Sequence, residues 1–108
     1  MGTQHSFNDI ADTDGVHISL AKFNRMEIAE DDKSVVVGSG TSWHSLMGLL
    51  ANNKLALANI PSKPKVNVVG SLITGEHGAG LSMPILSHYV YGFRIMNPRG
   101  EMDVVIKG

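Results

Sequence analysis

Residues 62–80 read SKPKVNVVGSLITGEHGAG, an apolar run that glycine and hydroxyl residues interrupt at short intervals. A strand that only fills a core does not need these interruptions, whereas glycine lets a backbone approach a ligand closely or adopt positive φ. A helix beginning near Gly70 would direct free N–H groups toward an anion such as a phosphate. The stretch therefore predicts a segment with a ligand-facing backbone, while its valine, leucine and isoleucine side chains are expected to lie in the core.

A second stretch, GTQHSF at residues 2–7, predicts a turn of small residues that presents one imidazole. A neutral imidazole is a competent nucleophile near neutral pH, because its unperturbed pKa is about 6.5. Backbone N–H groups and hydroxyls at Gly2, Thr3 and Ser6 would suit an anion-binding nest. The alternative is a frayed terminus without a ligand.

Composition limits the functions open to the chain. Its 108 residues fit one domain with a modest core, and 9 Lys+Arg against 10 Asp+Glu favour neither nucleic acid nor an anionic membrane as a partner. The absence of cysteine excludes a disulfide, a thiolate nucleophile and a zinc–thiolate site. No apolar run is long enough to span a bilayer and no signal-peptide pattern is present, so the expected localisation is cytoplasmic.

The N-terminal half predicts strands and then one amphipathic helix. Apolar residues alternate with small or polar ones over residues 16–21, which predicts a half-buried strand. A second strand near Met26, an acidic turn at residues 30–32 and the run at residues 35–37 predict a hairpin. Helical spacing follows, with Thr41 or Ser42 as N-cap, Asn52–Asn53 at the C-terminus, and one apolar face formed by Trp43, Leu46, Met47 and Leu50.

A second hairpin is predicted near the C-terminus. Residues 97–100, NPRG, suit a type I turn, and residues 102–106 would return as the partner strand. The preceding strand face would carry Tyr89, Tyr91, Phe93 and Ile95. The fold class is α+β, with mainly antiparallel strands and one clear amphipathic helix.

Several motifs in order carry a family resemblance: GTQHSFNDIADTDG at residues 2–15, GSGTSW at 38–43, IPSKPKVNVVGSLITGEHGAG at 60–80, and the late hairpin. Together they resemble the FAD-linked oxidases of the vanillyl-alcohol oxidase and p-cresol methylhydroxylase type, most closely the alditol (xylitol, sorbitol) oxidases and the aldonolactone oxidases. The resemblance implies that residues 1–108 are a fragment of a two-subdomain FAD-binding domain. Upstream strands and a downstream substrate domain are expected to lie outside it.

The resemblance also implies site residues. His5 matches the histidine that is bonded covalently to the 8α-methyl carbon of the flavin, and Ser62 matches a serine that touches both flavin and polyol. Further FAD contacts, largely through the backbone, fall on Gly2, Thr3, Gln4, Ser6, Asn67, Gly70, Ser71, Leu72 and Ile73. No catalytic residue is assigned, because the family's substrate-binding acidic, basic and histidine residues lie in a later domain.

The function implied is oxidation of a polyol or sugar-lactone alcohol by hydride transfer to covalently bound flavin, with O2 as acceptor. The alternative is a non-catalytic truncated remnant or interaction module of the same fold, and an exposed sheet edge is expected to favour self-association. Three residues depart from the family pattern: Lys65 replaces a commonly seen histidine, Asn67 a serine or threonine, and Glu76 a small residue. These departures weaken the substrate assignment most.

Three other motifs are weaker. GSG at residues 38–40 suggests a nicotinamide site, but Trp43 stands where the third glycine of that fingerprint belongs. His44 and His88 lack the spacing of metal ligands, so no metal is predicted. His77, in a TGxHGxG turn, is expected to form a structural hydrogen bond.

Overall fold

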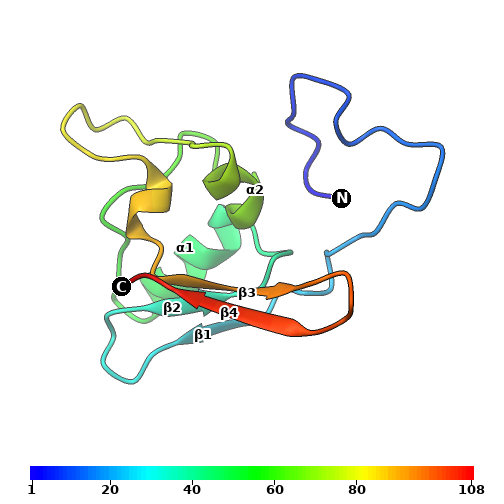
Figure 1. The fold of residues 1–108 in the computed structure, drawn as a ribbon. Helices are drawn as coiled ribbons and strands as arrows, with labels where there is room; N and C mark the ends of the chain where they lie inside the picture. Colours follow the sequence, from blue (N-terminus) through cyan, green and yellow to red (C-terminus); the bar gives the residue numbers. More distant parts are fainter.

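The computed structural model describes residues 1–108 and shows two antiparallel hairpins joined through a helical middle (Figure 1). The hairpins form two separate sheets. In chain order the elements are β1 (Met26–Ile28), β2 (Val35–Val37), α1 (Trp43–Asn52), α2 (Val68–Ile73), the 3-10 helix η1 (Leu86–Tyr89), β3 (Gly92–Met96) and β4 (Met102–Ile106). The predicted α+β class is therefore confirmed.

Both predicted hairpins are present. In the first, Met26 pairs with Val37 and the acidic turn places Asp32 at φ 56°. In the second, the amide of Gly100 donates to the carbonyl of Asn97 over 2.9 Å, which closes the predicted turn. Gly100 has φ 80°, a conformation that glycine adopts without steric cost.

The predicted helix is α1, and Ser42 is its N-cap: the Ser42 hydroxyl accepts from the amide of Ser45. Asn53 closes the C-terminus, as the sequence predicts. The helix expected near Gly70 is α2, which begins two residues earlier because the Asn67 side chain caps it. Neither of these helices, nor η1, has the length and apolar character needed to cross a membrane.

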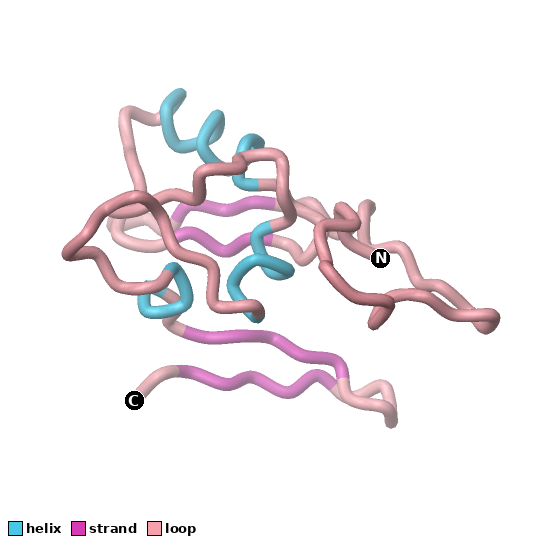
Figure 2. The backbone as a smooth tube through the Cα atoms, turned by 90° about the horizontal axis from the view of Figure 1, so that it is seen from above, coloured by secondary structure: helices cyan, strands magenta, loops and turns pink.

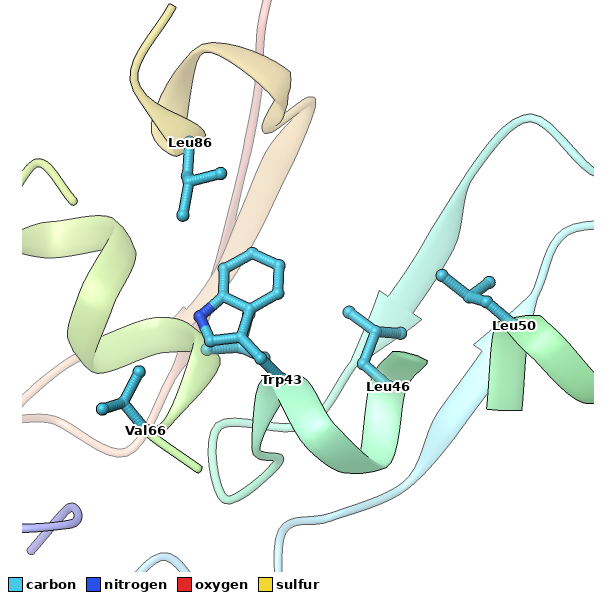
Figure 3. Packing of buried hydrophobic residues seen from close by; sticks show 6 residues of the cluster. Trp43, Leu46, Leu50, Val66 and Leu86 are labelled. Atoms are coloured by element: carbon cyan, nitrogen blue, oxygen red, sulfur yellow. The ribbon is translucent and has the colours of Figure 1, made fainter. Parts of the chain in front are cut away.

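A small core gathers around the indole of Trp43. Figure 3 shows Val66 and Leu86 on either side of this ring, with Leu46 and Leu50 following along α1. β1 and β2 cover this cluster with partly buried side chains from alternate positions. Its six buried members are Trp43, Leu46, Leu50, Val66, Val68 and Leu86.

The strand predicted over residues 16–21 is wrong. These residues form no strand, and Val16 and Ile18 are 90% and 68% exposed. Alternation predicts a strand only where a neighbouring backbone pairs with it. Here the long-range hydrogen bond of residues 16–21 is from the terminal amine of Met1 to the carbonyl of Ile18. The first part of the chain instead runs as an open segment at one side of the molecule, beyond α2 (Figure 1). Its end returns to the fold, where the carbonyls of Phe23 and Arg25 accept from the amides of Gly40 and Gly38.

The predicted strand face near residue 90 is corrected at its start. Tyr89 belongs to η1, whose turns are closed by bonds such as that from the amide of Val90 to the carbonyl of Ser87. The ladder begins at Tyr91, which accepts from the amide of Lys107 over 2.7 Å. Tyr89 therefore does not share the strand face.

Candidate functional site

Asn67 connects three segments that lie far apart in the sequence. Its Oδ1 accepts from the amide of Gly70 over 3.1 Å, and its Nδ2 donates to the carbonyl of Ser39 over 2.8 Å. Its own amide donates to the hydroxyl of Thr3 over 3.4 Å. One residue thus joins the start of α2, the glycine loop before α1 and the N-terminal segment that carries His5.

Backbone hydrogen bonds hold the starts of α1 and α2 together. The amide of Trp43 donates to the carbonyl of Val66 over 3.1 Å, and the amide of Val68 donates to the carbonyl of Thr41 over 2.9 Å. Ser42 and Asn67, the two N-caps, form an antiparallel bridge between these bonds. Both helix N-termini are therefore fixed at one place in the fold.

The amides in the first turn of α2 are largely used within the chain. The side-chain oxygen of Asn67 accepts from the amide of Gly70, and the carbonyl of Thr41 accepts from the amide of Val68. The free donor predicted at Gly70 is therefore absent. The amide of Val69 has no acceptor within the chain. Contact with a ligand at this turn therefore falls to Val69 N–H and to the open face of Gly70.

Gly70 has no packing reason to be a glycine. A Cβ there would meet only atoms of Asn67, at 3.8 Å and beyond, and the residue is exposed. By contrast, Gly78 is buried, and a Cβ there would strike the carbonyl of Ile60 and the side chain of Asn59. Glycine inside a helix costs about 0.5–1 kcal/mol relative to alanine. The open face of Gly70 is thus suited to close approach by a ligand.

The predicted residues 71–73 divide between core and surface. Ser71 is buried, and its hydroxyl accepts from Trp43 Nε1 over 2.6 Å and donates to the carbonyl of Val68 over 3.0 Å. Leu72 packs against the core, whereas Ile73 is 73% exposed. The side chains of Ser71 and Leu72 therefore support the fold, and Ile73 is available at the surface.

The N-terminal segment leaves its imidazole accessible. Residues 2–6 are all exposed, Gln4 has φ 60°, and the ring of His5 forms no hydrogen bond within the chain. Thr3 makes the one side-chain hydrogen bond from this segment to α2. The two stretches that the sequence analysis singles out therefore meet through Thr3 and Asn67.

Ser62 lies in a different place. It borders an open hollow of about 460 Å³, which no other predicted site residue lines. The hollow lies between α1 and the two loops before and after α2, and its lining residues are Met47, Asn59, Ile60, Pro61, Ser62, Pro64, Ala79 and Gly80. The Ser62 hydroxyl has no partner within the chain and is exposed, so it is free to contact a polar ligand.

Two further polar residues complete the site. His77 Nδ1 lies 2.8 Å from the carbonyl oxygen of Gly78, which is the structural hydrogen bond predicted for this residue. The hydroxyl of Thr41 is buried without any partner, which is a costly state for a polar group. The sequence alone suggests only an N-cap role for Thr41. No local signal in the sequence marks this burial, because it depends on the contact between the starts of α1 and α2, where the amide of Val68 donates to the carbonyl of Thr41.

Comparison with known proteins identifies the family. The family model described as FAD binding domain matches residues 1–105. This chain belongs to that family. Its FAD-binding domain shares 38% identity with an alditol oxidase from a Streptomyces species, over 96% of the chain and 26% of that protein. No solved structure matches it significantly.

Two more relatives have names that describe enzymes acting on sugar lactones. The domain is 34% identical to the mouse L-gulonolactone oxidase over 94% of the chain and 23% of that protein. It is 31% identical to an L-gulono-1,4-lactone dehydrogenase of Mycobacterium tuberculosis over the whole chain and 26% of that protein. The chain spans about a quarter of the length of these relatives. The family model and the names of these relatives together support membership of an oxidoreductase family that uses FAD.

Proposed function

We propose that this chain is the FAD-binding portion of an oxidoreductase that oxidises a polyol or a sugar-lactone alcohol. The observation that carries the proposal is the contact between Thr3 and Asn67, which brings the His5 segment to the start of α2. Relatives named as alditol and gulonolactone oxidases supply the substrate class.

The residues at this junction fit a flavin nucleotide. His5 is exposed and its ring is unpartnered, as covalent attachment requires. Thr3 accepts from the amide of Asn67, which leaves its own O–H free to donate to a phosphate oxygen. Gly70 offers open space beside the Asn67 side chain, and Val69 offers a free N–H. These groups are the small, donor-rich surface that an anionic ligand needs.

When bound, FAD would supply the redox chemistry, accepting a hydride from the alcohol carbon and passing the electrons to O2. His5 would hold the cofactor covalently, and Gly2, Thr3, Gln4 and Ser6 would contact its phosphates. Ser62 would orient the substrate hydroxyls from the neighbouring hollow. No residue of this chain is proposed as the catalytic base.

A second candidate is a non-catalytic module of the same fold. The observation that favours it is the exposure of both strands of the β3–β4 hairpin, every residue of which is exposed. An exposed apolar hairpin suits association with another polypeptide better than it suits catalysis.

Flavin retention separates these candidates. The chain is mixed with FAD, freed of unbound cofactor by gel filtration, and its visible absorbance is recorded. Flavin that the native chain retains, and that Asn67→Ala retains less because it loses the contact between the His5 segment and α2, supports the FAD-binding portion of an oxidoreductase. A native chain that retains no flavin contradicts that proposal and favours the non-catalytic module.

A further inference from the structure

The strand β4 has one edge without a partner. β3 pairs along its other edge, and this hairpin is a sheet of its own. Figure 2 shows β4, which ends at the C-terminus, as the outermost element on its side of the molecule, with β3 between it and the helices. Exposed strand edges of this kind bind other strands unless bulges, prolines or charges block them.

The register shows which groups point outward. The amide of Lys107 donates to Tyr91, and the amide of Asn97 donates to Glu101, at the two ends of the β3–β4 ladder. In an antiparallel pair, residues that exchange hydrogen bonds alternate with residues that do not. The odd-numbered residues of β4 therefore direct their N–H and C=O groups to β3. The N–H and C=O groups of its even-numbered residues point outward, and these residues are Met102, Val104 and Ile106.

We propose that two copies of this chain pair antiparallel through β4, with the two-fold axis at Val104. The outward N–H and C=O groups of Val104 would then bond to Val104 of the second copy. The outward N–H and C=O groups of Met102 would bond in the same way to Ile106 of the second copy. The pairing joins two hairpins into one continuous four-stranded sheet, and three or more strands give a sheet the stability that a lone hairpin lacks.

The side chains agree with this register. On one face, Met102, Val104 and Ile106 of both copies form an apolar row; they are 55%, 60% and 73% exposed in the single chain. On the other face, Glu101 lies opposite Lys107 of the second copy, and the symmetry repeats this pair. Glu101 also accepts from Asn97 and Arg99 of its own chain, which holds its carboxylate beside the strand end.

Other edge pairings lack this complementarity. A two-fold pairing of β3 centred on Arg94 would place two guanidinium groups opposite each other, and Pro98 has no N–H to continue the ladder. A head-to-tail pairing of β4 with β3 in the register of the hairpin would set Val104 against Arg94 and leave Glu101 opposite Asn97. The two-fold pairing through β4 therefore closes at the dimer. It is independent of flavin binding.

Sedimentation of two matched variants tests the pairing. Val104→Lys places like charges together at the axis, whereas Val105→Lys changes a similarly exposed valine and places its ammonium opposite Asp103 of the second copy. We expect a dimer for the native chain and for Val105→Lys, and at least tenfold weaker association for Val104→Lys. A native chain that stays monomeric at all concentrations, assembles beyond dimers, or loses association equally with either substitution would overturn the proposal.

Cysteine scanning gives a second measurement that does not depend on disruption. The chain has no cysteine. Hydrogen-bonded antiparallel residues have Cα atoms about 5.5 Å apart, within the usual range for a disulfide. Val104→Cys should therefore crosslink to itself under mild oxidation, and Val105→Cys, two positions out of register with its own copy, should crosslink much more slowly. Equal rates for the two variants would overturn the register.

Discussion

The hydrogen bond between Trp43 and Ser71 shows how single residues hold the site together. Trp43 is the largest member of the core, and its Nε1–H is satisfied by a hydroxyl that lies 28 positions along the chain. Ser71 in turn donates to the first turn of its own helix. The core and α2 are therefore coupled through one polar contact inside an apolar cluster.

Ser71→Ala is expected to destabilise the chain by about 1–3 kcal/mol, because it leaves the Trp43 N–H buried without an acceptor. Urea unfolding followed by fluorescence of the single tryptophan measures this loss. Ser62→Ala is the matched control, since Ser62 is exposed and unbonded, and its change should stay within about 0.5 kcal/mol. Equal stability of both variants would show that the contact does not stabilise the fold.

At the scale of elements, α2 depends on Asn67 for its start. The Oδ1 atom of its side chain caps the helix, and the Nδ2 atom donates to the carbonyl of Ser39. A single serine or threonine hydroxyl would make both of these hydrogen bonds less well, because it has one oxygen in place of two separate atoms. This dual bonding is a physical reason for an asparagine at a position where the family resemblance leads one to expect serine or threonine.

Asn67→Ala is expected to cost about 1–2 kcal/mol of unfolding free energy through loss of the cap, and to weaken FAD binding by releasing the Thr3 segment. Asn67→Ser should lose less, because it retains a capping oxygen. Asn24→Ala, an exposed asparagine without a side-chain hydrogen bond, is the control. Urea unfolding ranks the three variants, and a serine variant as unstable as the alanine variant would contradict the capping role.

The turn between β3 and β4 carries a titratable contact. The side chain of Asn97 and then that of Arg99 donate to Glu101 and lower the pKa of its carboxyl group. The folded hairpin thus favours the ionised carboxylate. Its contribution is complete above the ordinary pKa of a glutamate and is lost as the pH falls through the lower folded pKa.

We therefore expect the β3–β4 turn to loosen at acidic pH in the native chain and to be insensitive to pH in that window in Glu101→Gln. NMR titration of the turn residues measures this, in the Val104→Lys background so that one chain is observed. A Glu101 pKa at or above its ordinary value would contradict the hydrogen bonds of the turn.

Elements differ in how well the sequence predicted them. The start of α1 and the β3–β4 hairpin were predictable because a cap, a helical apolar spacing and an NPRG turn are local signals. The strand over residues 16–21 failed because alternation describes a strand only when another strand pairs with it. The contact of Thr3 with Asn67 spans 64 positions, so no spacing rule could have predicted how the two halves of the site meet.

At the scale of the whole molecule, the core is small for the length of the chain. Only 10 of 108 residues are buried, and the radius of gyration is 14.6 Å. A compact domain of this length is expected at about 13 Å. Apolar side chains remain exposed along the N-terminal segment and both faces of the β3–β4 hairpin. The stability of a single copy should therefore be low and should depend on what binds it.

We expect the Tm of the native chain to rise with protein concentration, because pairing through β4 stabilises the folded state by mass action. The Tm of Val104→Lys should be independent of concentration, and that of Val105→Lys should rise like that of the native chain. Differential scanning calorimetry over a wide concentration range measures this. A native Tm that does not move would contradict the dimer at the concentrations tested.

The most direct measurement is whether flavin stays with the protein after acid precipitation. The chain is incubated with FAD, precipitated with acid and washed, and the pellet is tested for flavin fluorescence. Fluorescence is predicted in the native pellet and in that of His17→Ala, an equally exposed histidine of the same segment, and its loss is predicted in His5→Ala. A colourless native pellet, or fluorescence that persists in His5→Ala, would contradict covalent attachment through His5.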